Sequence, residues 1–368
     1  MTLKLLENQF EPFFDAPFNA YEHDSLYVSP LKSDLKRFVD ANENPLFDNP
    51  DDIAIFAVTK NGTPVGRISA HVHRKSNTHY KLNQAYFGYF DCIDDTDVSN
   101  LLLSAVESWA RDKGFTEVTG NFNLTAMQQI GVVTDHFEAQ PFTDLVYNPP
   151  HIPRLLEAHG YTAEFPMTTF SLDLTNTEPP AIGTKQQAIL DNPDFAFVPI
   201  TRRNVKTRME QARKILNASF AKNPMFVPVS EQEFHFQAKD MVWIIDPRIS
   251  AMLTYKGEPI ATILCVPDMN PFLSRVRSRM SIIAPFLFLW HKLRCKRAVL
   301  IFSAVVPQWQ GKGVNPVVLR QVITAMQKAG YQILGNTWIA DVNPASLAQK
   351  EKAGATRLHR VHLYRKTL

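Results

Sequence analysis

Two glycines that are one residue apart, Gly311 and Gly313, stand on either side of Lys312 in a short segment between two apolar stretches. Glycine has no Cβ, so its backbone N–H group can turn towards a ligand that other residues would keep at a distance. The lysine adds a positive charge at the same place. The segment therefore has the chemistry of an anion-binding loop, although the same glycines are also compatible with an ordinary surface turn.

The residues after this loop predict the start of a helix. Asn315 is among the best residues for the N-cap, and Pro316 is favoured in the first helical position because its missing N–H group would have no partner there. The first N–H groups of a helix have no intrahelical acceptor, and the helix dipole puts a partial positive charge at this end. A glycine-containing loop that leads into such a helix predicts a site for a diphosphate.

This segment resembles the acyl-CoA loop of the GNAT superfamily, which follows the pattern Gln/Arg-x-x-Gly-x-Gly/Ala between a strand and a helix. Gln310 and Gly313 occupy two key places, and Asn315 stands where the pattern has a small residue. The resemblance implies acetyl-CoA or a longer acyl-CoA as co-substrate, and no metal. The residues that it implies for CoA binding are Val305, Val306, Gln310, Gly311, Lys312, Gly313, Val314 and Asn315.

In a GNAT fold, the strand expected at Gly335–Ala340 would splay away from the strand expected at Ala298–Val306. The pantetheine arm would lie in this wedge and would bond to backbone groups at the end of the earlier strand. The resemblance also places Asn343 near the thiol end of CoA, as the one residue with an implied part in catalysis. Because Pro344 follows it, Asn343 is equally compatible with the N-cap of a helix.

Many GNAT enzymes have a tyrosine in the following helix that protonates the departing thiolate, and Lys350 takes its place here. An amine acceptor must also lose a proton, and the sequence does not identify the base. Asp341 and Glu351 are the nearest carboxylates along the chain, and each is expected to be a solvated surface group. Positioning of the substrates, and a backbone N–H group that polarises the thioester carbonyl, would then carry much of the catalysis.

The elements that position this loop recur twice along the chain. Each half begins with a predicted hairpin, turned by Asn61-Gly62 in the first half and by Lys256-Gly257 in the second. A strand follows, and then a helical stretch that ends at a glycine followed by an aromatic residue. The predicted strands are Ala85–Cys92 and Ala298–Val306, and the predicted helices are Leu101–Gly114 and Val317–Gly330.

This repetition predicts an α/β protein of the α+β type with two tandem GNAT-like domains, each a mixed and mostly antiparallel sheet flanked by helices. The length of 368 residues also favours two domains over one. We expect residues 1–178 to form a degenerate GNAT-like domain, residues 179–194 to form a linker, and residues 195–368 to form the acyl-CoA-binding domain. The alternative is two unrelated α/β domains that share a hairpin and helices by chance.

The first half lacks the chemistry of the phosphate loop. Its strand-to-helix junction, Asp91–Val98, has no glycine pair and no cation, and its carboxylates would repel a diphosphate while capping the helix favourably. We therefore expect this half to serve as a scaffold or as a wall of the acceptor site. Its insertion, residues 123–150, either reaches over the cleft between the halves or packs as a plain loop.

No metal site is expected. His71 and His73 are predicted to share one face of a strand and His79 follows nearby, but neither a cysteine nor a carboxylate accompanies them. The three cysteines are far apart in the sequence and form neither a paired framework nor a zinc motif, which favours a reducing compartment.

A second insertion carries the strongest local charge in the chain. Its apolar run, Ile282–Trp290, is well short of the ~20 residues that cross a bilayer. Residues 275–297 therefore predict either peripheral contact with an anionic membrane or a long acyl chain, or an ordinary core helix with solvated flanks. The flanking cations are Arg275, Arg277 and Arg279 before the run, and Lys292, Arg294, Lys296 and Arg297 after it.

Composition bounds the remaining possibilities. The net charge of +3 gives no global field for a polyanion, so no nucleic-acid partner is expected. The N-terminus shows no export signal. We expect a cytoplasmic monomer that is at most peripheral to the inner face of the membrane.

These observations predict an acyl-CoA-dependent N-acyltransferase that acts on a small-molecule or lipid amine, with a lipid-like or long-chain substrate as the more specific form. One alternative is a non-catalytic acyl-CoA-binding sensor, which the replaced tyrosine permits. Another is a GNAT-fold transferase that uses aminoacyl-tRNA, against which the CoA loop speaks. The sequence has no Gly-x-Ser-x-Gly turn, which argues against a serine hydrolase.

Overall fold

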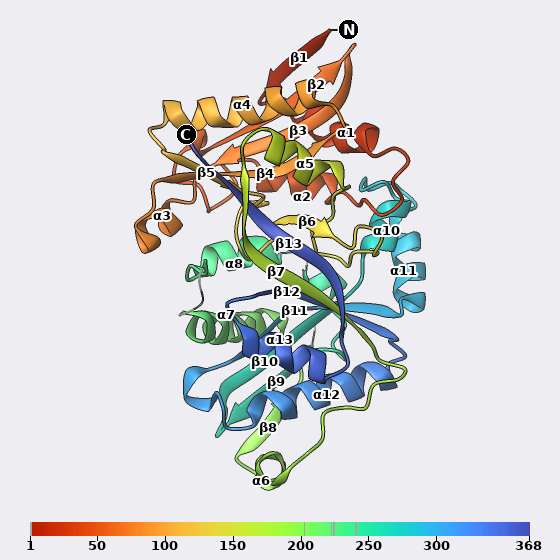
Figure 1. The fold of residues 1–368 in the computed structure, drawn as a ribbon. Helices are drawn as coiled ribbons and strands as arrows, with labels where there is room; N and C mark the ends of the chain where they lie inside the picture. The colour runs from red at the N-terminus through yellow and green to blue at the C-terminus, as the bar shows by residue number, and fades with distance from the viewer. Residues whose placement is uncertain (1, 202, 222, 224, 240) are drawn as a thin grey trace.

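The computed structural model describes residues 2–201, 203–221, 223, 225–239 and 241–368. Its strands form one continuous sheet that runs through both halves of the chain and carries helices on its faces (Figure 1). This confirms the predicted class. The strands are β1 (Leu3–Glu7), β2 (Ile53–Lys60), β3 (Thr63–His71), β4 (Gln84–Cys92), β5 (Glu117–Gly120), β6 (Val132–Asp135), β7 (Thr162–Asp173), β8 (Phe195–Val198), β9 (Ala251–Tyr255), β10 (Glu258–Pro267), β11 (Arg297–Val305), β12 (Ile333–Ala340) and β13 (Thr356–Thr367).

The strand order is β1-β2-β3-β4-β5-β13-β7-β12-β11-β10-β9-β8, and β6 pairs with β13 outside this path. The first half has the helices α1 (Phe10–Ala20), α2 (Lys32–Phe38), α3 (Arg74–Tyr80), α4 (Thr96–Asp112) and α5 (His151–Ala158). The second half has α6 (Thr184–Asp191), α7 (Val205–Phe220), α8 (Glu231–Ala238), α9 (Met241–Ile244), α10 (Asn270–Arg275), α11 (Ala284–Arg294), α12 (Val314–Lys328) and α13 (Pro344–Lys352).

Both predicted hairpins are confirmed. Asn61 and Gly62 have φ angles of 52° and 86°, and Lys256 and Gly257 have φ angles of 51° and 85°. Two consecutive positive φ angles give a turn whose twist matches that of the strands it joins. These turns connect β2 to β3 and β9 to β10, so the two hairpins hold equivalent places in the two halves.

The helices α4 and α12 hold equivalent places after β4 and β11. Each buries one apolar face, as shown by Leu102 and Val106 in α4 and by Val318 and Val322 in α12. Residues four apart lie on one side of a helix, so these side chains form a continuous contact with the sheet.

The last strands of the two halves change places. β7 comes from the first half and pairs with β12 of the second, whereas β13 ends the chain and pairs with β5 of the first half. β7 and β13 also pair with each other along the seam between the halves (Figure 1). The division at residues 178 and 195 stays a prediction, and the final strand adds to the sheet of the first half.

The sheet opens into a wedge in each half. The parallel strands β11 and β12 pair only over residues 297–300 and 333–336, and then diverge. The same happens between β4 and β5 beyond residues 84–86 and 117–119. The splay predicted for the second half is therefore confirmed, and the first half repeats it.

The segment predicted to be a linker lies along α12. Arg320 donates to the carbonyls of Pro179 and Pro180 at 3.3 and 2.7 Å. The side-chain amide of Gln327 donates to the carbonyls of Leu174 and Thr177, both at 2.8 Å. This fixed path carries the short helix α6 to the start of α12.

The two insertions meet at a buried carboxylate, Asp268, at the end of β10. Its oxygen Oδ1 accepts hydrogen bonds from the N–H group and the hydroxyl of Thr143, both at 3.0 Å. Its oxygen Oδ2 accepts one from Arg297 Nε at 2.8 Å. The first insertion thus reaches the second half and packs there. Nowhere in the described ranges is a helix long and apolar enough to cross a membrane.

Candidate functional site

The loop between β11 and α12 turns at both of its glycines. Gly311 and Gly313 have φ angles of 72° and 85°, a left-handed conformation that glycine adopts without steric cost. Gly313 is the N-cap, and α12 begins at Val314. The chain therefore passes from β11 through a tight loop directly into a helix, as predicted.

The predicted cap of this helix is wrong. Asn315 and Pro316 lie inside the first turn, because the left-handed Gly313 ends the loop two residues earlier than expected. The Asn315 side-chain oxygen instead accepts a hydrogen bond from the Ser303 hydroxyl at 3.2 Å. In the first half, Asp95 caps α4 through hydrogen bonds from the N–H groups of Asp97 and Val98, so that helix also starts earlier than predicted.

Three consecutive N–H groups of the loop are available to a ligand. In the part of the chain that the structure describes, the N–H groups of Gly311, Lys312 and Gly313 donate to no acceptor. The Gln310 side-chain amide braces the loop by donating to the Val305 carbonyl at 2.9 Å. Free main-chain donors beside a helix N-terminus form a concavity that suits a diphosphate.

The helix α6 adds side chains that the sequence analysis missed. A Cβ atom at Gly313 would stand 3.1 Å from Gln186 Nε2 and 3.7 Å from Lys185 Cβ. Lys185 is exposed, so the loop has a second cationic side chain nearby besides Lys312. A polar linker composition gives no sign of where the segment folds back, which is why these residues were not found.

A hollow of about 450 Å³ opens between α12, α13 and the splayed strands β11 and β12. Asn315 and Ser303 line it at the start of α12, and Lys350 and Asn336 line it further along. Its other walls are mainly apolar. The hollow thus leads from the first turn of α12 into the wedge, and its other lining residues are Leu172, Leu300, Leu319, Ile323, Leu334, Gln349, Ala353 and Ala355.

The free edge of β11 faces this wedge. The N–H group of Val306 donates to the Ile260 carbonyl of β10 at 2.9 Å, so it points away from the wedge. Successive residues of a strand direct their backbone groups to opposite neighbours, so Val305 faces the wedge. Val305 is therefore the better placed of the two for a passing pantetheine, and the CoA contacts implied for both residues stay predictions.

Lys350 projects from α13 into the hollow. Its ammonium donates to the side-chain oxygen of Asn336, a buried residue of β12, at 2.6 Å. The surrounding protein desolvates this ammonium and lowers its pKa to about 8. A proton that leaves this easily near neutral pH is unusual for lysine, and it stands in the wedge where the sequence pattern led us to expect a tyrosine.

Asn343 caps α13, as the second interpretation of this residue predicted. Its side-chain oxygen accepts a hydrogen bond from the Ser346 N–H group at 3.2 Å. Its implied place near the thiol of CoA stays a prediction.

Asp341 and Glu351 are held by arginines. Asp341 accepts two hydrogen bonds from the Arg360 guanidinium, at 2.8 and 2.6 Å. These hydrogen bonds lower the pKa of the Asp341 carboxyl. Glu351 accepts a hydrogen bond from Arg357 at 2.7 Å. A carboxylate that is paired with an arginine is a poor general base, so another residue is needed for this role.

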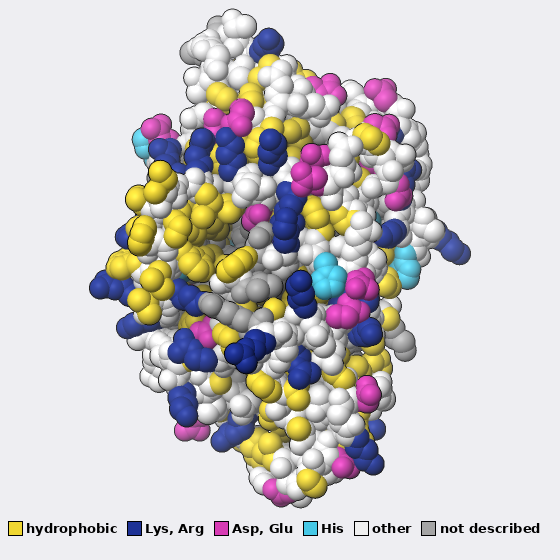
Figure 2. All heavy atoms as spheres, turned by 180° about the vertical axis from the view of Figure 1, so that it is seen from behind, with side chains coloured by type: hydrophobic (Ala, Val, Ile, Leu, Met, Phe, Trp, Pro, Cys, Tyr) yellow, Lys and Arg dark blue, Asp and Glu magenta, His cyan; other side chains and the backbone are white. Residues whose placement is uncertain are grey.

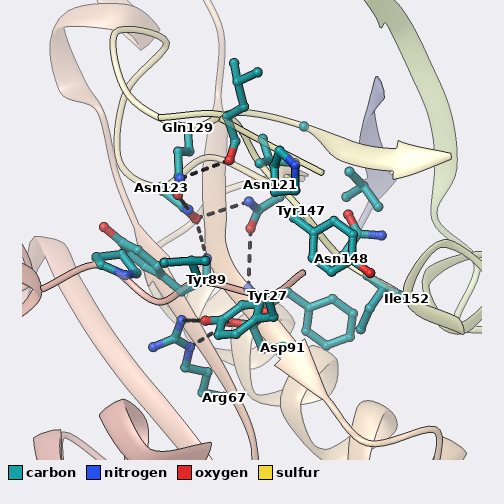
Figure 3. A pocket seen from close by; sticks show the side chains of 18 of the residues that line it. Tyr27, Arg67, Tyr89, Asp91, Asn121, Asn123, Gln129, Tyr147, Asn148 and Ile152 are labelled. Atoms are coloured by element: carbon teal, nitrogen blue, oxygen red, sulfur yellow. Dashed lines mark hydrogen bonds and ion pairs between the residues drawn. The ribbon is translucent and has the colours of Figure 1, made fainter. Parts of the chain in front are cut away.

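A second hollow, of about 600 Å³, fills the wedge of the first half (Figure 3). At its base the buried Arg67 donates to Asp91 and to the Tyr27 hydroxyl, both at 2.8 Å. The side chains of Asn121 and Asn123 line another wall and are joined by a hydrogen bond of 3.1 Å. A hollow with such polar walls can receive a polar head group, whereas the cap at Asp95 closes this half to a diphosphate.

Asp144 lies between this hollow and the buried Asp268. It follows Thr143, and the next residue, Leu145, lines the hollow. The Asp144 side chain is accessible to solvent, yet desolvation by the surrounding protein raises its pKa to about 7. Its φ angle of 67° is uncommon for a residue other than glycine and often marks a functional position.

Phe142 of the first insertion and Lys350 of α13 lie on opposite faces of β12. A Cβ atom at Gly335 would lie 2.5 Å from the Phe142 ring, so Phe142 packs on the face of the sheet to which Gly335 points. The next residue along the strand, Asn336, points to the other face, where Lys350 meets it. No sequence pattern pointed to Asp144, because its carboxyl is desolvated only in the folded chain.

The histidines of the first half do not form the expected pair. His71 ends β3, whereas His73 stands outside the strand and precedes α3, so the prediction of a shared strand face is wrong. His71 is buried with Nε2 2.9 Å from the Leu124 carbonyl, and desolvation lowers its pKa to about 3. It therefore acts as a neutral core residue.

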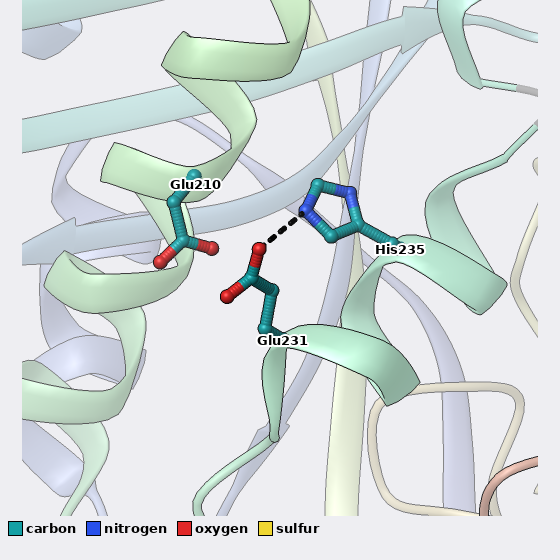
Figure 4. Close-up of side chains that lie close together, drawn as sticks. All are labelled: Glu210, Glu231 and His235. Carbon is teal, nitrogen blue, oxygen red and sulfur yellow. Dashed lines mark ion pairs between the residues drawn. The ribbon is translucent and has the colours of Figure 1, made fainter.

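Among the residues that the structure describes, one group of side chains has the spacing of a metal site, namely Glu210, Glu231 and His235 (Figure 4). His235 Nε2 lies 3.7 Å from a Glu231 oxygen. Glu210, however, already accepts two hydrogen bonds from Arg213, at 2.8 and 2.6 Å. The arginine neutralises this carboxylate, and we draw no metal site from the group.

No family model matches the chain. The solved structure of a tandem GNAT protein from the clavulanic acid biosynthesis pathway superimposes on 100% of this chain and 98% of its own, with a TM-score of 0.61 and 11% identity. The chain has the tandem GNAT fold. The resemblance inferred from the phosphate loop and from the repeated elements is thus confirmed as a likeness of fold.

Two proteins are similar to this chain in sequence over nearly its whole length. Protein YghO of Escherichia coli (strain K12) is 24% identical, over 99% of this chain and 94% of its own. Bacterial ceramide synthase of Caulobacter vibrioides is 23% identical, over 98% of this chain and 95% of its own.

Proposed function

We propose that the protein is an acyl-CoA-dependent N-acyltransferase. The observation that carries the proposal is the set of unpartnered N–H groups at Gly311, Lys312 and Gly313, which open onto α12 and onto the hollow that leads into the wedge. A diphosphate on the loop would direct the pantetheine along this hollow. The thioester would then lie between β11 and β12, near Lys350.

In this proposal the two substrates would enter from the two faces of β12. Acyl-CoA would enter on the face of α12 and α13, and the amine on the face covered by the insertion at residues 123–150. They would meet in the wedge, where no strand pairing intervenes beyond residue 300. Holding the reactants in this way is itself a large part of catalysis.

The transfer needs two proton movements. The amine nitrogen attacks the thioester carbon, the C–N bond forms, and the proton that the nitrogen releases goes to Asp144. The C–S bond then breaks, and the departing thiolate takes a proton from the Lys350 ammonium. Both groups return to their starting states by proton exchange with water. A carboxyl with a pKa of about 7 and an ammonium with a pKa of about 8 suit these roles near neutral pH.

We further propose a long-chain amine as acceptor. Ceramide is an N-acylated long-chain amino alcohol, and the ceramide synthase that resembles this chain covers it almost completely. The polar walls of the first-half hollow, which include Asn121 and Asn123, suit the head of such a molecule.

The test is thiol release from acyl-CoA in the presence of an amine panel, with the product identified by mass spectrometry. We expect release only with an amine, more with a long-chain amino alcohol than with its short-chain counterpart, and an amide product. Tight acyl-CoA binding without release under any amine would instead show a sensor. Transfer from aminoacyl-tRNA without any from acyl-CoA would overturn the proposal in favour of the RNA-dependent alternative.

A further inference from the structure

The helix α11 and the turn before it expose a row of large apolar side chains. Ile282, Phe286 and Leu293 are 93%, 74% and 78% exposed. Water-exposed side chains of this size are normal one at a time, but a contiguous group of them marks an interaction surface. We call this group the α11 surface, and its other members are Met280, Ile283, Leu289 and Trp290.

Cations surround the α11 surface. Residues 270–297 contain no aspartate or glutamate. The guanidinium groups of Arg275 and Arg294 lie 4.4 and 5.0 Å from the centre of the Trp290 ring, on the rim of the surface. In the described part of the chain neither arginine pairs with a carboxylate. Figure 2 shows hydrophobic side chains gathered on one flank of the molecule with lysine and arginine at their border.

The α11 surface is built onto a firm base. His291 of α11 lies with Nε2 2.8 Å from the carbonyl of Asp268. Ahead of the helix, the Ser278 hydroxyl donates to the carbonyl of Ser29 at 2.6 Å. These contacts to both halves fix the position of α11 and of the turn before it, so the apolar side chains remain on the surface.

The same base connects the α11 surface with the acceptor side of the site. Asp268 binds Thr143, the neighbour of Asp144, and Asn270 at the start of α10 lines the first-half hollow. The α11 surface and the first-half hollow are thus joined through these buried contacts.

We propose that the α11 surface docks on an anionic lipid bilayer. An apolar face rimmed by unpaired arginines complements a layer with a hydrocarbon interior and negatively charged head groups. A protein partner or a second copy of this chain would need carboxylates facing Arg275 and Arg294 in addition to an apolar face. The proposal does not rest on acyl transfer, because docking needs neither acyl-CoA nor an amine.

Flotation with vesicles tests the docking on the full chain without substrates. We expect binding to phosphatidylcholine vesicles that contain phosphatidylglycerol, weaker binding to phosphatidylcholine alone, and loss of binding as salt is raised. The double variant Phe286→Ser/Leu293→Ser should lower the partition coefficient on the order of 100-fold, because it removes two apolar side chains that the bilayer would bury. Leu190→Ser, at an exposed leucine of α6 on a different part of the molecule, should bind as the original chain does.

Sedimentation of the same proteins without lipid distinguishes the other occupants. Because both substituted side chains are exposed, the double variant should keep its melting temperature, and equal binding by folded variant and original chain would overturn the proposal. A dimer that the double variant converts to a monomer, together with no vesicle binding, would assign the α11 surface to self-association instead. Failure of thiol release with intact vesicle binding would overturn only the acyltransferase proposal.

Discussion

The substitution Lys350→Met tests whether the Lys350 ammonium has a catalytic role or only a structural one. Methionine keeps a flexible apolar stem of similar length in the hollow and removes the charge. Desolvation lowers the pKa of Lys350 from the usual 10.5 to about 8, and at about 1.36 kcal/mol per pKa unit the charged form costs the folded state roughly 3 kcal/mol. The lost hydrogen bond leaves the Asn336 oxygen without its donor, which costs about 1 kcal/mol.

The net expectation is a gain in unfolding free energy of about 2 kcal/mol near neutral pH, measured by urea denaturation. The pKa of Lys350 is lower in the folded state than in the unfolded state, so between pH 8 and 10.5 the unfolded chain binds the proton that the folded chain releases. The contribution of this residue to stability therefore rises with pH in that window. The methionine variant should lack this rise.

Activity should move in the opposite direction. Loss of a general acid costs on the order of 100-fold or more in rate, so kcat should fall while the affinity for acyl-CoA changes little. The kcat of the original chain should decline as pH rises through about 8, where Lys350 loses its proton, and the variant should lack that decline. Lys352→Met, at an exposed position two residues along α13, is the matched control for both measurements. Unchanged kcat and an unchanged alkaline limb in the Lys350 variant would refute the assignment.

Three further substitutions test other parts of the site. Gly313→Ala places a Cβ at a left-handed residue, so it should cost about 1–2 kcal/mol in unfolding free energy and weaken acyl-CoA binding by calorimetry, whereas Gly330→Ala, also left-handed, should cost stability alone. Asp144→Asn should remove the acid limb of the pH–rate profile near pH 7, which a purely structural role would leave in place. Asp268→Ala leaves Arg297 without its buried partner and should lower unfolding free energy by about 3–5 kcal/mol, seen as a lower melting temperature.

Much of the fold was predictable because its turns and helix ends depend on residues that are close together in the sequence. Asn61-Gly62 and Lys256-Gly257 dictate hairpins through their positive φ angles, and the glycine that ends each long helix marks its C-terminus. These signals are short-range, and they occur twice in the same order. The helix starts were less predictable, since the left-handed Gly313 competes with the cap signal of Asn315 and wins.

What escaped prediction depends on contacts between distant residues. The sequences of β7 and β13 do not predict that these strands exchange places between the two halves. Either strand could pair with the sheet edge at β5 or at β12. The sequence showed that Lys350 stands where many GNAT enzymes have a tyrosine. Its lowered pKa comes from desolvation in the folded protein and could not be predicted. Asp144 had no sequence signal, because the desolvation that raises its pKa arises only in the folded chain.

A crystal structure of the protein with bound CoA tests the central claim most directly. We predict diphosphate oxygens within hydrogen-bonding distance of the N–H groups of Gly311, Lys312 and Gly313, with the pantetheine entering the wedge between β11 and β12. A diphosphate bound elsewhere, with these three N–H groups still unoccupied, would contradict the account.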